Sequence, residues 1–384
     1  MTYDLAHLRK KEFPWAERGE RVYLNHASTG PLPARSIEAI ASWAAMRGQP
    51  WRISDDEEIA VMHRARELAA RLVSASPDEI ALTPNTSHGI NIASRCLPLR
   101  AGDVVITPDR EFPANVYPWM ALGREGIVYE RVPCTALGVP DEDAILSALD
   151  RPRVRVLSLS WVSFATGYTF DLERIGRACR QRGIYFVVDA IQGVGARPLD
   201  ARACLIDILA CGGQKWLLSQ WGTGFAYVRR ELVQELEPRQ IGWLAVRDSY
   251  DFSRLVDYDL TWYGDARRFE VGTLPYHDLA AFCTSLEMLL DVGIDRIASH
   301  VDTLIDNAIS RLHAADATVV TPHDPAHRAA ILTVRVKNPA RASEQLARAG
   351  IVCSLREGAI RLSPHLYSTS GDMDRALEVL LPEV

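Results

Sequence analysis

Two stretches of the sequence decide the fold: residues 184–189 read IYFVVD, and residues 206–215 read IDILACGGQK. Each opens with a short apolar run. The first run ends at Asp189, and the second leads through two glycines to Lys215. Apolar runs of four to eight residues are typical of strands buried on both faces of a sheet. We therefore expect two strands with Asp189 and Lys215 just beyond their carboxyl ends.

The same pattern of short apolar run, turn and longer helical segment recurs through the first two thirds of the chain. Strand-like runs lie at residues 80–83, 104–107 and 154–159, and residues 172–182 have helical character. Buried strands that alternate with helices indicate a largely parallel sheet covered on both faces. This part of the chain is therefore expected to have an α/β fold.

From about residue 265 the pattern changes to that of a smaller α+β unit. The expected elements are helices at 279–292 and 294–313, a strand at 331–336, a hairpin within 351–362 and a helix at 372–381. We therefore expect three regions: an N-terminal segment (1–20) that packs on the small domain, a large domain (21–264) and a small C-terminal domain (265–384).

The composition is that of a globular protein and argues against several classes. Of 384 residues, 48% are hydrophobic and the net charge is −6, which provides no basic footprint for nucleic acid or a membrane surface. No apolar run reaches the roughly 18 residues of a spanning helix. The seven cysteines are scattered and odd in number, as in reduced proteins. We expect a cytoplasmic protein without nucleic-acid or membrane partners.

Two clusters of metal-ligand residue types have simpler interpretations. Residues 54–58 (SDDEE) fit a capping box with acidic residues in the first turn of a helix. Residues 323–327 (HDPAH) contain a proline and fit a solvated turn. We expect no metal site.

The acid and the amine at the two strand ends match the needs of pyridoxal phosphate. A lysine among apolar neighbours is usually snorkelled or paired, but it can also be a desolvated amine that forms a Schiff base with the cofactor's aldehyde. A carboxylate keeps the pyridine nitrogen protonated, so that the ring can accept electrons from a substrate carbanion. Asp189 and Lys215 are the candidates for these roles.

A phosphate cradle is expected at residues 85–91, NTSHGIN, which follow a strand and open a helix. Free backbone N–H groups and hydroxyls can meet a dianion at the positive end of a helix dipole. Phe112 follows another strand-like run and could lie flat on the pyridine ring.

Six motifs in the same order resemble the class V aminotransferase family, the fold-type I pyridoxal phosphate group that includes cysteine desulfurases. They lie at residues 85–91, 111–115 (EFPAN), 189–192 (DAIQ), 212–216 (GGQKW), 269–273 (FEVGT) and 361–367 (RLSPHLY). The resemblance runs from about residue 23 to the end of the chain. It implies a seven-stranded, mostly parallel sheet between helices in a cofactor-binding large domain, and a homodimer with its site at the subunit interface.

The resemblance also implies individual roles. Lys215 would form the Schiff base and move the proton at the substrate's α-carbon, while Asp189 would pair with the pyridinium and Gln192 with the ring hydroxyl. Phe112 would stack on the ring. The phosphate would be held by residues of the cradle and of the lysine motif, and by one residue reaching the partner subunit's site: Thr86, Ser87, His88, Gln214 and Thr273.

Three residues are candidates for contacts with the substrate. Arg361 would bind the α-carboxylate, and its chain neighbours would face the other side of the strand. His26 and Arg356 are expected to line the same pocket. Cys353, the last cysteine of the chain, lies in an apolar stretch and is expected to be a buried, inert thiol, which disfavours desulfuration through a protein-bound persulfide.

We therefore expect a pyridoxal phosphate enzyme that acts on an α-amino acid, with a carbon–sulfur β-eliminating lyase as the leading reaction. An aminotransferase or epimerase is the first alternative, and a catalytically idle, cofactor-binding dimeric partner is the second. A nicotinamide-dependent dehydrogenase would need a Gly-x-Gly-x-x-Gly turn after the first strand, and none occurs in this position.

Overall fold

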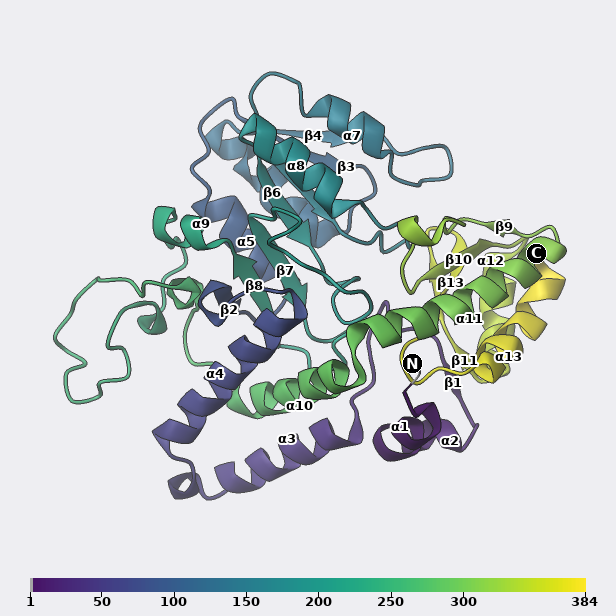
Figure 1. The fold of residues 1–384 in the computed structure, drawn as a ribbon, viewed down its shortest axis with the longest axis horizontal. Helices are drawn as coiled ribbons and strands as arrows, with labels where there is room; N and C mark the ends of the chain where they lie inside the picture. Colours follow the sequence, from purple (N-terminus) through teal and green to yellow (C-terminus); the bar gives the residue numbers. More distant parts are fainter. Residues whose placement is uncertain (1–2) are drawn as a thin grey trace.

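The computed structural model describes residues 3–384, which form a large sheet covered by helices and a smaller sheet beside it (Figure 1). The large sheet has seven strands in the order β2-β8-β7-β6-β5-β3-β4. Their bounds are β2 (Ile80–Leu82), β3 (Val104–Pro108), β4 (Val128–Val132), β5 (Val154–Ser160), β6 (Tyr185–Asp189), β7 (Ile208–Gly212) and β8 (Gly224–Val228).

Six of these strands run in the same direction, and β8 runs in the opposite one. β4, β3, β5, β6 and β7 pair in parallel, whereas β8 is antiparallel to both β7 and β2. The expected α/β fold with a seven-stranded, mostly parallel sheet is confirmed. Because β5, β6 and β7 are parallel neighbours, their carboxyl ends meet at one edge, where ligands bind in sheets of this kind.

The strands are apolar throughout because each face of the sheet packs on its own core. On β6, Phe186 and Val188 belong to one buried cluster and Val187 belongs to the other. The first cluster is covered by α4 (Asp55–Leu72), α7 (Glu142–Ala148), α8 (Leu172–Arg182) and α10 (Tyr276–Val292); the second is covered by α5 (Thr86–Cys96), α6 (Tyr117–Ala121) and α9 (Arg230–Glu235). α8 has the bounds expected from the sequence.

The smaller sheet is antiparallel, with strand order β12-β13-β10-β9. Its elements are β9 (Thr318–Val319), β10 (Leu332–Arg335), β12 (Ser354–Arg356) and β13 (Ala359–Leu362), with α11 (Ile294–Ala314), α12 (Pro339–Arg348) and α13 (Ser370–Leu380). α10 instead packs on α3 (Ala34–Arg47) and α4. The domain boundary at residues 264/265 stays a prediction, and these contacts group α10 with the large sheet.

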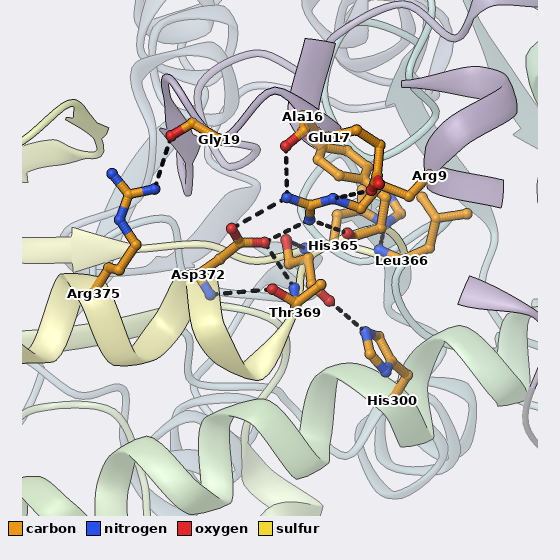
Figure 2. Close-up of polar contacts among 12 residues, drawn as sticks. Arg9, Ala16, Glu17, Gly19, His300, His365, Leu366, Thr369, Asp372 and Arg375 are labelled. Carbon is orange, nitrogen blue, oxygen red and sulfur yellow. Dashed lines mark hydrogen bonds and ion pairs between the residues drawn. The ribbon is translucent and has the colours of Figure 1, made fainter. Parts of the chain in front are cut away.

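The N-terminal segment contacts the C-terminal part of the chain. α1 (Leu5–Glu12) and α2 (Pro14–Glu17) lead into β1 (Val22–Tyr23), which pairs in parallel with β11 (Ile351–Val352). Figure 2 shows the buried Arg9 guanidinium donating to Asp372 on α13 at 2.6 Å and to the carbonyl of Ala16 at 2.9 Å. Phe13 stacks on Tyr367 with ring centroids 4.1 Å apart. No helix within residues 3–384 is both long and apolar enough to cross a membrane.

Candidate active site

Asp189 lies at the carboxyl end of β6, opposite Ser160 on β5 and Ala210 on β7. Its side chain is fully buried: Oδ1 accepts a hydrogen bond from the backbone N–H of Ile191 at 3.0 Å, and Oδ2 has no partner. Burial raises the pKa of this carboxyl to about 6. Buried polar atoms are nearly always paired, so the free Oδ2 is suited to a donor from a ligand, such as a protonated ring nitrogen.

Lys215 lies just beyond β7 and is 8% exposed. Burial lowers the pKa of its amine to about 8; the charge of Asp189 opposes this shift, and the charge of Arg361 adds to it. An amine that is partly neutral near pH 8 is a much better nucleophile than an ordinary lysine. The amine therefore has the chemistry needed to attack an aldehyde.

An aromatic ring lies over this amine. Lys215 Nζ is 5.4 Å from the centroid of Phe112, whose ring in turn meets Phe164 edge-on at 5.4 Å. Phe112 is 42% exposed, so part of its ring is open to a ligand. Phe112 and Asp189 thus both lie close enough to Lys215 to interact with its amine.

The expected phosphate cradle begins α5. Asn85 caps the helix by accepting a hydrogen bond from the backbone N–H of His88 at 3.0 Å, and Ser87 is exposed at the helix start. Thr86 is buried, and its Oγ1 accepts from the backbone N–H of Gly212 at 3.0 Å. These contacts bring the first turn of α5 to the end of β7, where backbone N–H groups can bind an anion.

The side chains of Gln214 and Thr86 both lie close to Gly212, which has no side chain of its own. A Cβ on Gly212 would lie 2.5 Å from Gln214 Oε1 and 3.3 Å from Thr86 Oγ1, so these two polar groups meet over the bare backbone. The cradle fits a phosphate group. His88 lies apart from this junction: it has a backbone hydrogen bond with Phe269, and burial lowers the pKa of its imidazole.

Gln192 adds a buried amide to the residues around Lys215. Gln192 is buried; its amide donates to the carbonyl of Ala27 at 3.0 Å, and its Oε1 accepts from Trp216 Nε1 at 2.8 Å. The amide is thus held rigidly beside the segment that carries Lys215. One of its N–H donors remains for a ligand.

Arg361 on β13 is 1% exposed, and within residues 3–384 no ion pair joins it to a carboxylate. Its donors reach three neutral oxygens: Ser354 Oγ at 3.1 Å, Phe164 O at 2.7 Å and Ser28 Oγ at 2.8 Å. Three of the five N–H donors of the guanidinium are thus in use, and two remain, which is the number a carboxylate accepts in a bidentate pair. Burial, and next the charge of Arg356, lower the pKa of Arg361 to about 10.

His26 has a structural place, which corrects the expectation that it contacts the substrate. It is fully buried, its Nδ1 donates to the carbonyl of Ser363 at 2.7 Å, and its Nε2 accepts from the hydroxyl of Tyr367 at 2.9 Å. Burial, with the charge of His365, keeps the pKa of His26 well below its usual value. Both ring nitrogens are therefore occupied, and neither can serve a substrate.

The two remaining candidates are exposed. Arg356 lies at the end of β12 and donates to Ser28 Oγ at 3.4 Å. Thr273 lies in the loop before α10, on the rim of a cavity of about 430 Å³ that Trp43, Trp243 and Phe252 also line. The role of Thr273 at a partner subunit's site stays a prediction.

Sequence reasoning missed Glu111, although it precedes Phe112 in a motif that was recognised. Its carboxylate accepts from the backbone N–H and hydroxyl of Ser160, at 2.7 and 2.5 Å. Burial, opposed by these hydrogen bonds and supported by the charge of Asp189, raises the pKa of Glu111 to about 7. The contact ties the loop that carries the ring to the strand beside Asp189, and only the pairing of β5 with β6 reveals it.

Comparison with known proteins shows the family of the chain. The model of the family "Aminotransferase class-V" matches residues 22–375, and the chain belongs to this family. It is therefore an enzyme, and pyridoxal phosphate is its cofactor, as in the family.

Two related proteins and one solved structure are similar to this chain over nearly its whole length. A probable cysteine desulfurase of Methanothermobacter thermautotrophicus is 30% identical, with 94% of both chains covered. An isopenicillin N epimerase of Amycolatopsis lactamdurans is 28% identical, covering 95% of this chain and 98% of that protein. The solved complex of the cystine C–S lyase C-DES with its product cysteine persulfide has the same fold, with a TM-score of 0.87 and 22% identity over 97% of this chain and 100% of that one.

Proposed function

We propose that this enzyme acts on an α-amino acid with its cofactor joined covalently to Lys215, and that it eliminates a sulfur-bearing group from the β-carbon. The observation that carries the first part is the pair of opposite, incomplete groups at one sheet edge: an unpartnered carboxylate oxygen on Asp189 and a desolvated amine on Lys215. Pyridoxal phosphate, when bound, supplies an aldehyde and an electron-withdrawing ring.

Each residue of the site then has one task. Asp189 accepts the proton-bearing ring nitrogen at its free Oδ2, and Phe112 covers one face of the ring. Thr86, Ser87 and Gln214 hold the phosphate at the start of α5. Gln192 donates to the ring hydroxyl. Lys215 would be the point of covalent attachment and, when its amine is free, would move the proton at the substrate's α-carbon.

The two free N–H donors of Arg361 would orient the substrate by its α-carboxylate. A bidentate pair fixes the carboxylate plane, and the contacts to Ser354, Phe164 and Ser28 fix the guanidinium in turn. Because the guanidinium and the carboxylate are both fixed, a bound substrate would have its α-carbon aligned with the Lys215 amine.

Elimination without a protein persulfide is favoured by the state of Cys353. This thiol is half-buried, and burial raises its pKa to about 11, so that it stays protonated at neutral pH. A protonated thiol is a poor nucleophile. A solved structure with the same fold is a cystine C–S lyase, and this supports elimination at the β-carbon as the reaction class.

An epimerase or aminotransferase is the second candidate. The 28% identity to isopenicillin N epimerase over nearly the whole chain favours it. Both reactions share the loss of the α-proton and differ in where the next proton arrives. The intact Lys215 and Asp189 argue against a catalytically idle binding partner.

We also infer a homodimer in the cytoplasm. The loop that follows α9, residues 236–264, projects from the body of the molecule (Figure 1), and it exposes apolar side chains that include Tyr258 at 91% and Val256 at 74%. A patch of this kind beside Thr273 is suited to a second copy of the chain. The seven cysteines are all free, which supports a reducing compartment.

A panel of amino acids incubated with the purified holoenzyme tests the proposal. Release of keto acid, ammonia and sulfide together indicates elimination; keto acid without ammonia indicates amino transfer, and a change of configuration alone indicates epimerisation. Protein that takes up no added pyridoxal phosphate would remove the enzymatic proposal altogether.

A further inference from the structure

Arg356 and Arg361 converge on one serine from opposite strands of a hairpin. β12 ends at Arg356, residues Glu357 and Gly358 turn with φ of 46° and 77°, and β13 returns with Arg361. Ser28 Oγ accepts from Nη2 of Arg361 at 2.8 Å and from Nη2 of Arg356 at 3.4 Å. One hydroxyl oxygen thus holds two cations in the same small space.

Neither cation has an acid to neutralise it. Within residues 3–384, the hydrogen bonds of Arg356 go to the carbonyl of Leu355 and to Ser28, and no ion pair joins either arginine to a carboxylate, the adjacent Glu357 included. The charge of Arg356 also disfavours the protonated forms of Lys215 and Arg361. Like charges kept this close raise the energy of the empty site, and a bound anion would relieve this repulsion.

The two arginines lie at different depths, so one carboxylate does not satisfy both. Arg361 is 1% exposed and retains two free N–H donors, which the substrate's α-carboxylate fills. Arg356 is exposed, with three N–H donors free, and the Ser28 hydroxyl proton is also available. An anionic group at the far end of a substrate side chain would reach this outer position.

We propose that Ser28 and Arg356 form a second anion subsite, and that the preferred substrates are α-amino acids whose side chain carries a carboxylate. This inference rests on the proposed action on α-amino acids and adds the class of side chain. Because Arg356 lies nearer solvent, its contribution is selectivity between acidic and neutral side chains. Arg361 holds the group that every α-amino acid shares.

Matched acid and amide pairs provide the test. Glutamate is compared with glutamine, and S-carboxymethylcysteine with its amide, by the change they cause in the visible absorbance of the holoenzyme, which reports binding whichever reaction follows. The acid of each pair should bind at least tenfold more tightly than the amide. In Arg356→Gln this ratio should fall to within twofold, and Arg356→Lys should restore part of it.

A second measurement does not need the cofactor. In the cofactor-free protein, calorimetry should show tighter binding of glutarate than of its monoamide, and Arg356→Gln should remove the difference. Arg348→Gln on α12, an exposed arginine paired only with Glu344, is the matched control and should keep both ratios.

Equal binding of acid and amide by the unmodified protein, or a ratio that persists in Arg356→Gln, overturns the subsite while leaving action on amino acids intact. If no amino acid of the panel changes the absorbance of the holoenzyme, the proposed function fails and the subsite fails with it.

Discussion

Arg9 and Arg361 are both buried arginines, and their surroundings differ in one respect. Arg9 forms ion pairs with Asp372 at 2.6 Å and Glu17 at 2.9 Å and fills its remaining donors with carbonyls (Figure 2). Arg361 has only neutral oxygens around it. A buried charge is tolerated when something compensates it. In the Arg9 cluster the chain supplies the anion, and at Arg361 we propose that the substrate supplies it.

The same contrast extends to the carboxylates. Asp372 is fully engaged with Arg9 and with the first turn of α13, whereas Asp189 keeps one oxygen free. Completed polar clusters hold the N-terminal segment to the C-terminal part, and incomplete ones surround Lys215. Incomplete pairing therefore separates the ligand site from the structural clusters, and substitutions on both sides test this distinction.

Removal of the Lys215 amine should have the largest effect. Lys215→Ala should lose covalent attachment of the cofactor and at least about 10²-fold in kcat, because we propose the residue as both the attachment point and the base at the α-carbon. Borohydride reduction followed by peptide mapping checks the attachment. Lys10→Ala, in the N-terminal segment, is the control. Normal turnover by Lys215→Ala would contradict the assignment.

One substitution in each arginine cluster should separate an effect on stability from an effect on substrate binding. Asp372→Ala leaves Arg9 buried beside a single partly exposed acid, and the free energy of unfolding should fall by about 3–5 kcal/mol. Arg361→Gln removes an uncompensated charge, so stability should hold, while KM for amino acids should rise roughly 10- to 150-fold with the loss of about 1.5–3 kcal/mol of charged hydrogen bonding.

Urea unfolding and steady-state kinetics on both variants separate the two effects. An unchanged KM in Arg361→Gln would mean that the substrate carboxylate is held elsewhere. A large loss of stability in that variant would mean that Arg361 is a structural residue like Arg9.

The free energy of unfolding of the cofactor-free protein should depend on pH, because the amine of Lys215 is buried. The pKa of Lys215 is lowered to about 8 in the folded state, against about 10.4 for an ordinary lysine. Between these values the unfolded chain holds more protons, so the free energy of unfolding should rise with pH, by on the order of 2–3 kcal/mol in all. Below pH 8 both states are protonated and the dependence disappears.

Asp189 should act in the opposite sense at lower pH. Because the pKa of this carboxyl is raised to about 6, the folded state holds the extra proton between about pH 4 and 6, and stability should decrease as pH rises through that range. Denaturant titrations across pH measure both slopes. Lys215→Met should lose the slope at high pH, and Asp189→Asn should lose the slope at low pH. Slopes that persist in both variants would assign them to other groups.

The smallest effect is expected at Cys353. Its raised pKa makes the thiol inert, so Cys353→Ser should change turnover by less than about twofold. Sulfide release that stops in this variant would restore a desulfurase mechanism through a protein persulfide.

Local patterns in the sequence predicted the strands and the polar residues at their ends. Apolar runs located the strands, and Asp189 and Lys215 could be placed at their ends because the side chain and its strand are adjacent in the chain. The bounds of α8 followed from its periodicity and from the glycine that ends it. The cofactor assignment used these residues together with the phosphate cradle and the order of the six motifs.

Contacts between distant segments were not predictable in the same way. His26 was expected in the pocket, but its partners, Ser363 and Tyr367, lie more than 300 residues away, and no local pattern announces them. Ser28, which links two arginines, was missed for the same reason. The role of Glu111 depends on the neighbouring strand and not on its own spacing.

The pairing of β1 with β11 has a consequence for how the chain is made. Val22 emerges from the ribosome early, yet its hydrogen-bonding partner is Ile351. The large sheet can assemble while synthesis continues, because its strands lie between residues 80 and 228. The opening segment must wait, with Phe13 and Leu24 exposed to water, until the last strands arrive and close over them.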